Sequence, residues 1–190
     1  MTESWNDLSD ETLAARYAWP QGRWSRLNMV VSVGGHATGH SGTSHTITSA
    51  HDRQLLRAVR HHAQVVVVGA ASVRAEGWFM PAHGDLVVVT RSPELPDGCP
   101  DPQRTRVTQL ENLATLVSEY RHVLCEGGPT LAHTMIAASL IDELLLTFET
   151  SDSAPIALPD WLSGTGQSWS CVSDIVDDTH RFTIWRRGEG

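Results

Sequence analysis

Short apolar runs recur along the middle of the chain, separated by segments in which apolar residues stand three or four positions apart. The short runs are typical of strands buried on both faces, and the spaced pattern is typical of helices. Predicted strands cover residues 27–33, 64–68, 86–89, 106–108, 121–125 and 144–148. Predicted helices cover residues 52–63, 72–76, 110–120 and 129–139. This alternation predicts a mainly parallel sheet with helices on both faces.

The two ends of the chain follow different patterns. Residues 5–17 predict a short helix that Ser9 can cap, and residues 21–26 read as a linker. Residues 169–176 and 182–186 flank a polar Asp-Asp-Thr-His sequence, which predicts a β-hairpin. We therefore expect an α/β fold: an N-terminal helix and linker over 1–26, then a single domain over 27–190. Its parallel sheet would be flanked by helices and carry a C-terminal antiparallel hairpin.

Composition restricts the possible chemistry. The 190 residues carry a formal net charge of −8, and all 14 basic residues are arginine. An acidic chain without a basic face is a poor nucleic-acid binder, and without lysine neither a Schiff base nor a P-loop is available. Three isolated cysteines suit a reducing compartment. Since no apolar run reaches the roughly 18 residues of a membrane helix, we expect a cytoplasmic protein with no membrane partner.

Ten histidines raise the question of a metal site. His36, His40 and His45 lie in a long polar loop, but neither they nor the pair at 61–62 match a zinc-binding spacing. The serine-hydrolase elbow and the zinc-deaminase signature are also missing from the sequence. We expect no bound metal.

The strongest local signal is Arg-His-Val-Leu-Cys-Glu-Gly-Gly-Pro-Thr-Leu at residues 121–131. It reads as a strand, a glycine pair and a helix whose first turn holds Pro129. Gly127 and Gly128 allow backbone N–H groups to approach a ligand closely, and a helix N-terminus favours an anion. The pattern suggests a pyrophosphate cradle without lysine. A tight strand–helix turn that binds nothing is the alternative.

Arginines supply two further candidate sites. Arg91, between Thr90 and Ser92, follows a predicted strand at the sheet edge where α/β proteins bind ligands. It could hold a 2′-phosphate and favour NADPH over NADH. Arg53, Arg57 and Arg60 share one face of a predicted helix and could bind a sugar phosphate. The alternative for both sites is an ordinary solvated surface.

Together these segments resemble the pyrimidine reductase family of riboflavin biosynthesis, both the C-terminal reductase domain of the bifunctional deaminase–reductase and its stand-alone relatives. The matching segments, in order, are residues 15–20, 26–32, 41–42, 52–60, 66–77, 90–92, 126–131 and 141–144. The most specific are Val-Gly-Ala-Ala-Ser-Val-Arg-Ala-Glu-Gly at 68–77 and Glu-Gly-Gly-Pro-Thr-Leu at 126–131.

The resemblance implies a dihydrofolate-reductase-like fold, NADPH as cofactor and a homodimer. The implied reaction transfers a hydride to ribose C1′ of a ribosylaminopyrimidine phosphate. The implied cofactor contacts are Val30, Gly69, Ser72, Glu76, Thr90, Arg91, Ser92, Gly127, Gly128, Pro129, Thr130 and Leu131. The implied substrate contacts are Asn28, Ser44, Arg60 and Glu126. Arg60 would lie near the substrate phosphate, and Glu126 is the candidate to deliver the proton.

Two departures from the family pattern leave alternatives open. The first strand of the family ends in Ser-Leu-Asp-Gly, whereas here Gly34 stands at the aspartate position. Ala71 and Ser72 replace a Gly-Thr pair. The alternatives are a related NADPH-dependent reductase of another small heterocycle or pterin, and a non-catalytic NADPH-binding paralogue.

Overall fold

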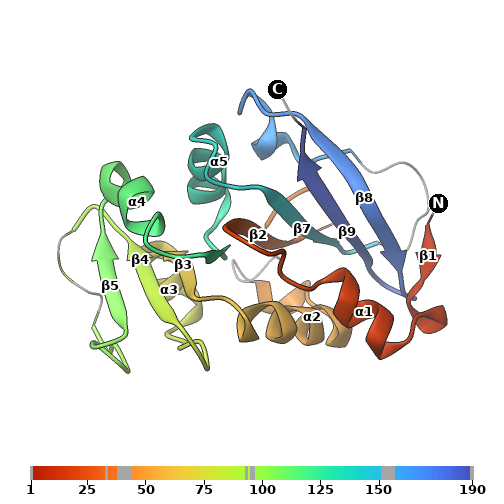
Figure 1. The fold of residues 1–190 in the computed structure, drawn as a ribbon, viewed down its shortest axis with the longest axis horizontal. Helices are drawn as coiled ribbons and strands as arrows, with labels where there is room; N and C mark the ends of the chain where they lie inside the picture. Colours follow the sequence, from red (N-terminus) through yellow and green to blue (C-terminus); the bar gives the residue numbers. More distant parts are fainter. Residues whose placement is uncertain are drawn as a thin grey trace.

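The computed structural model describes residues 2–32, 34–37, 44–92, 94, 97–150 and 157–188. The described residues form one nine-stranded sheet in the order β1-β8-β9-β7-β2-β6-β3-β4-β5 (Figure 1). Its strands are β1 (Glu3–Ser4), β2 (Trp24–Val31), β3 (Val65–Gly69), β4 (Asp85–Val89), β5 (Thr105–Thr108), β6 (His122–Cys125), β7 (Glu143–Phe148), β8 (Trp169–Val176) and β9 (Arg181–Arg187).

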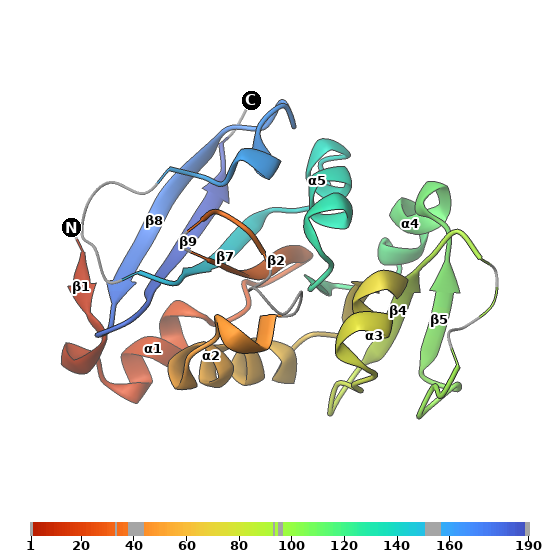
Figure 2. The same ribbon diagram turned by 180° about the vertical axis from the view of Figure 1, so that it is seen from behind.

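Helices cover both faces of this sheet (Figure 2). They are α1 (Asp10–Arg16), α2 (Ala50–His61), α3 (Ala70–Glu76), α4 (Leu110–Val117) and α5 (Pro129–Ala137), with short 3-10 turns η1 (Trp5–Asp7), η2 (Ser44–Thr46) and η3 (Asp160–Leu162). Apolar residues of α4 and α5 pack in one core, and those of α1, α2 and α3 pack in the other. None of the helices in the described ranges has the length and apolar character needed to cross a membrane.

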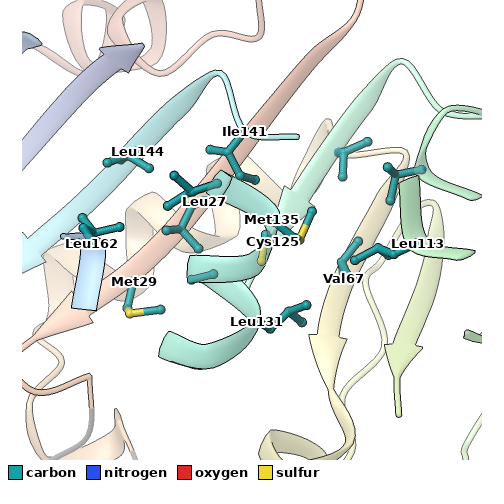
Figure 3. Packing of buried hydrophobic residues seen from close by; sticks show 14 of the residues in the cluster. Leu27, Met29, Val67, Leu113, Cys125, Leu131, Met135, Ile141, Leu144 and Leu162 are labelled. Atoms are coloured by element: carbon teal, nitrogen blue, oxygen red, sulfur yellow. The ribbon is translucent and has the colours of Figure 1, made fainter. Parts of the chain in front are cut away.

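The core under α5 shows why the sheet is so apolar (Figure 3). Leu131 and Met135 of α5 belong to the same buried cluster as Leu27 of β2 and Leu144 of β7, two strands that pair with each other. In β3, all four valines are buried because helices cover both faces of this strand. The continuous apolar runs of the sequence are therefore interior strands, as predicted.

The C-terminal hairpin also forms as predicted. β9 runs antiparallel to β7, and β8 runs antiparallel to β9, whereas β2, β6, β3, β4 and β5 pair in parallel. The short strand β1, which the sequence pattern did not predict, adds to the outer edge of β8. Two residues are too few to show an alternating pattern.

Two boundaries near the N-terminus differ from the prediction. The predicted helix over 5–17 is divided into η1 and α1, because the Ser9 side chain accepts a hydrogen bond from the Thr12 backbone N–H (3.1 Å) and starts a new helix there. The first long strand begins at Trp24, three residues early, so the predicted linker over 21–26 is half strand. The Trp24 backbone N–H donates to the Arg121 carbonyl oxygen (2.8 Å), which extends the pairing.

A buried ion pair ties the N-terminal segment to the sheet. Arg26 and Glu143 are each 1% exposed, and the Arg26 Nε–Glu143 Oε2 distance is 2.6 Å. Arg26 also donates to the carbonyl oxygens of Tyr17 and Ala18 (2.7 and 2.8 Å). The side chain of Arg26, in β2, thus holds residues 15–20 against this strand.

Candidate functional site

Two adjoining hollows lie along the edge where the parallel strands β3, β4 and β6 end. The first, called the small pocket, has a volume of about 330 Å³ and is lined by residues of β2, α2, α3 and the β6–α5 turn. The second, called the large cleft, has a volume of about 1070 Å³ and is lined by the ends of β3 and β4 and the starts of α3, α4 and α5. Ser72, Gly128 and Pro129 line both hollows. This edge is where α/β sheets bind ligands.

Every residue that the family resemblance assigned to the site lines one hollow or both. The small pocket includes Asn28, Val30, Ser44, Arg60, Ser72, Glu76, Glu126, Gly127, Gly128 and Pro129. The large cleft includes Gly69, Ser72, Thr90, Arg91, Ser92, Gly128, Pro129, Thr130 and Leu131. Most implied cofactor contacts thus lie in the large cleft, but Val30, Glu76 and Gly127 line only the small pocket, with the implied substrate contacts.

Arg60 and Glu126 form a two-pronged ion pair in the small pocket. Arg60 Nε donates to Glu126 Oε1 (2.8 Å), and Arg60 Nη2 donates to Oε2. The guanidinium also lies 4.1 Å from the centre of the Phe79 ring, within cation–π range. Because both oxygens of Glu126 accept from Arg60, proton delivery by Glu126 stays a prediction that requires this pair to open. Arg53 and Arg57 are exposed and line neither hollow.

The other wall of the small pocket joins η2 to α3. The backbone N–H and the hydroxyl of Ser44 both donate to Glu76 Oε1, each at 2.9 Å. Ser44 is an implied substrate contact and Glu76 an implied cofactor contact, so the structure links the two groups directly. This contact anchors one end of the long polar loop. The matching residues at 41–42, like Val33 and His40, lie outside the described residues.

The glycine pair after β6 has two different steric roles. The Glu126 backbone N–H donates to the Val67 carbonyl oxygen (2.9 Å), which fixes the turn to β3. A Cβ placed on Gly127 would lie 2.5 Å from Leu131 Cδ2, so this glycine is required by internal packing. A Cβ on Gly128 would meet no atom within 4 Å, although Gly128 lines both hollows. The position that a Cβ of Gly128 would occupy is therefore open space at the boundary of the two hollows.

Arginines from two elements border the large cleft. Arg91 follows β4 and is exposed, and the Gln109 side-chain amide donates to its carbonyl oxygen (3.4 Å). Arg74 of α3, not assigned from sequence, lines the same cleft. Beside Arg91, the Ser92 backbone N–H donates to the Thr90 hydroxyl (3.1 Å). An anionic ligand in the large cleft could thus contact the guanidinium groups of Arg74 and Arg91. It could also contact the N-terminus of α5, where the N-cap residue Gly128 has no side chain.

Sequence reasoning missed several residues of the small pocket, above all Asp52. The residues Asp52, Leu56 and Arg60 stand four positions apart on α2, and all three line the pocket. Asp52 follows the helix cap Ser49 by three residues, and an acidic residue there is common at any helix start. Its spacing from Arg60 was the signal that could have revealed it.

The described histidines do not build a metal centre. In the described ranges, no three His, Cys, Asp or Glu side chains come together as a possible metal site. His51 instead pairs with Asp177 (Nδ1–Oδ2, 2.7 Å), and His180 Nε2 lies 3.0 Å from the Ile47 carbonyl oxygen. These contacts attach the turn of the C-terminal hairpin to the first turn of α2 and to the segment that precedes it.

The fold and the paired hollows define a dihydrofolate-reductase-like α/β protein. Residues 23–150 match the RibD C-terminal domain, and the chain belongs to that family. No curated protein matches the sequence.

Solved structures share the fold at low sequence identity. A pyrimidine reductase-like protein from Corynebacterium diphtheriae superposes with a TM-score of 0.72 at 15% identity, covering 88% of this chain and 93% of that one. Acinetobacter baumannii RibD gives 0.69 at 18% identity, with 88% of this chain matching 59% of that one. Dihydrofolate reductase from Enterococcus faecalis, complexed with NADP(H), gives 0.65 at 16% identity, covering 87% and 97%.

Proposed function

We propose that this protein is an NADPH-dependent reductase that converts a ribosylaminopyrimidine phosphate to its ribityl form. The observation that carries the proposal is the shared wall of Ser72, Gly128 and Pro129 between the large cleft and the small pocket. A hydride donor in one hollow and an acceptor in the other would meet across this wall. Membership of the RibD C-terminal domain family supports this reaction class.

The large cleft fits a dinucleotide phosphate on three grounds. Its volume of about 1070 Å³ is at the upper end of the range for small-molecule sites. Open space at the absent Cβ of Gly128 lets a ligand approach the backbone. The first turn of α5 leaves the N–H groups of Thr130 and Leu131 without helical partners. We propose that these groups hold the pyrophosphate and that Arg91 and Ser92 hold the 2′-phosphate.

NADPH, when bound, supplies the hydride, and the protein supplies orientation and electrostatics. Asn28 lies in β2 with its side chain on the face opposite to Leu27 and Met29, and it lines the small pocket. We propose that it contacts the substrate ribose. Glu126, held by Arg60, faces the same pocket and orients the substrate.

A proton must reach the ribose ring oxygen when the hydride reaches C1′ and the C1′–O4′ bond opens. Glu126 can deliver it only after its contacts with Arg60 are broken and it has taken up a proton. Arg60 therefore acts on the reaction by holding Glu126. The phosphate contact implied for Arg60 competes with that role, because the same guanidinium already binds a carboxylate.

Calorimetric titration with NADPH and with NADH tests the cofactor part of the proposal. We expect micromolar or tighter binding of NADPH and clearly weaker binding of NADH. The turnover assay then follows NADPH oxidation with the ribosylaminopyrimidine phosphate, for which we expect rates of roughly 1 s⁻¹ or more, typical of metabolic enzymes. Binding of NADPH without turnover would refute the reductase and leave a cofactor-binding protein. Binding of neither nucleotide by folded protein would refute both.

A further inference from the structure

Phe79 covers one face of the guanidinium that holds Glu126. It lies in the segment between α3 and β4 and lines the small pocket. The central guanidinium carbon of Arg60 lies 4.1 Å from the centre of the Phe79 ring, a cation–π distance. The hydrogen bonds to Glu126 leave in the plane of the same group, from Nε and Nη2. Arg60 is therefore held at its face by Phe79 and at its edge by Glu126.

The surroundings of this contact favour a strong interaction. Phe79 is half-buried and packs against the core cluster that contains Leu55 and Val59 of α2. The Arg60 side chain is 28% exposed, so most of it is shielded from water. A cation–π contact strengthens as the cation loses water. The ring therefore limits the orientations that the guanidinium can adopt.

The segment that carries Phe79 is itself fixed on both sides of this residue. The Trp78 indole N–H donates to the Asp97 carbonyl oxygen (2.7 Å). Arg104 Nη2 donates to the carbonyl oxygen of Pro81 (2.9 Å), and Pro81 is buried. Because Trp78 precedes Phe79 directly and Pro81 follows it by two positions, the ring has little freedom to leave the guanidinium.

An aromatic side chain in a pocket wall has a simpler explanation, which is that it fills space. Leucine would fill much of the same space, but it has no π face and cannot attract a cation in this way. The two explanations therefore predict different results for Phe79→Leu.

We propose that Phe79 is a positioning residue for the reaction: by holding the Arg60 guanidinium, it fixes the orientation of Glu126 in the small pocket. When the contacts between Arg60 and Glu126 open for proton delivery, the ring still holds the guanidinium, and the pair can form again. The inference rests on the proposed function for the role of Glu126, but the contact itself can be measured without turnover.

Hydrogen exchange at Arg60 Nε tests the contact directly. In the wild type, the hydrogen bond to Glu126 Oε1 slows the exchange of this hydrogen with water. We would follow its signal by ¹⁵N NMR and assign it by its loss in Arg60→Lys. We expect Phe79→Leu to speed the exchange by about threefold or more, the factor that corresponds to a partly shielded cation–π contact. Phe79→Tyr, which keeps the ring, should exchange like the wild type.

The matched control is Phe182→Leu, which makes the same change in the same core cluster at a phenylalanine that is 1% exposed. It should lower the stability to urea and leave the exchange at Arg60 unchanged. If Phe79→Leu does not fold, Phe79→Met takes its place in the comparison. Wild-type exchange in Phe79→Leu, or equally fast exchange in Phe182→Leu, would overturn the proposal and leave Phe79 as a packing residue.

The kinetic test separates action through Arg60 from a general loosening of the pocket. We expect Phe79→Leu to lower kcat by about threefold or more with an unchanged KM for NADPH, and Phe79→Tyr to keep the wild-type kcat. In an Arg60→Ala background, Phe79→Leu should have no further effect, because the guanidinium that it would release is already gone. An effect of the same size in that background would contradict the proposal. If the wild type shows no turnover, the proposed function fails, whereas the exchange measurement still decides the role of Phe79.

Discussion

Arg60 and Glu126, 66 positions apart in the sequence, meet through two hydrogen bonds from one guanidinium to one carboxylate, with an Nε–Oε1 distance of 2.8 Å. The pair is only partly shielded, with side-chain exposures of 28% and 10%. A planar guanidinium makes such a fork and an ammonium does not. The orientation of Glu126 in the small pocket therefore depends on arginine at position 60.

Replacement of Arg60 tests this dependence. We expect Arg60→Lys and Arg60→Ala both to lower kcat by about tenfold or more, because lysine keeps the charge but loses the fork. NADPH affinity, measured by calorimetry, should change little. Arg57→Ala removes an exposed arginine of the same helix and serves as the control with unchanged kinetics. Wild-type kcat in Arg60→Lys would show that charge alone is sufficient.

The two neighbouring glycines should respond oppositely to the same substitution. Gly127→Ala places a methyl group 2.5 Å from Leu131, so we expect a loss of about 1–3 kcal/mol in the free energy of unfolding. Gly128→Ala meets no atom within 4 Å and should cost no more than about 1 kcal/mol as a helix cap. Its methyl group would instead enter the hollows and weaken NADPH binding. Urea unfolding and calorimetry measure the two effects, and unchanged NADPH affinity in Gly128→Ala would remove the cradle from the proposal.

Arg91 is expected to set the preference between nucleotides. Arg91→Ala should reduce the ratio of NADPH to NADH affinity by about tenfold or more, since a charged hydrogen bond to the 2′-phosphate is lost and NADH has no such group. Arg106→Ala is the matched control, because Arg106 pairs with Glu119 (2.6 Å) away from the large cleft. A ratio that stays at the wild-type value in Arg91→Ala would assign the 2′-phosphate elsewhere, and Arg74 is then the next residue to replace.

The elements were largely predictable, whereas their arrangement was not. The four valines of β3 and the polar turn before β9 are local signals, and both elements formed where expected. The sheet order was not predictable, because β6 enters between β2 and β3 through contacts distant in sequence. At the site, the resemblance supplied residues one at a time. It could not supply their pairing, because Arg60 and Glu126 were each assigned to the substrate and no sequence signal joined them. The contact of Arg60 with a substrate phosphate stays a prediction. Asp52 was missed because its place in a helix start already explained it.

Acid should loosen the turn of the C-terminal hairpin. Burial acts to raise the pKa of Asp177, but hydrogen bonds from the Thr179 backbone, His51 and the His180 backbone outweigh it and lower the pKa below 3.8. A folded-state pKa below the unfolded value gives stability that is present above about pH 3.8 and is lost as pH falls through the folded pKa. We expect Asp177→Asn to cost about 1 kcal/mol at pH 6 and less at pH 3.

The neighbouring substitution Asp178→Asn, in the same turn but exposed, is the control for that experiment. Urea unfolding of the three proteins at both pH values gives the comparison. An equal cost of Asp177→Asn at pH 6 and pH 3 would contradict the assignment.

The buried ion pair under the N-terminal segment should be costly to break from one side. Glu143→Ala leaves the guanidinium of Arg26 buried without its partner, and we expect a loss of about 3–5 kcal/mol in unfolding free energy. Glu119→Ala, which removes the partner of Arg106 at the surface, should cost far less, because solvent screens an exposed ion pair. Chemical denaturation measures both. Similar small losses in the two variants would mean that Arg26 finds another partner.

The pairing of β2 with β6 and β7 has a consequence for how the chain can assemble during synthesis. β2 ends at Val31, yet its two neighbours end at Cys125 and Phe148. During synthesis, β2 therefore has no pairing partner on either edge until most of the polypeptide has emerged from the ribosome. The β3–β4–β5 unit, whose contacts are local, can form first. In the nascent chain, the unpaired edges of β2 can therefore associate with strand edges of other chains until Phe148 has left the exit tunnel.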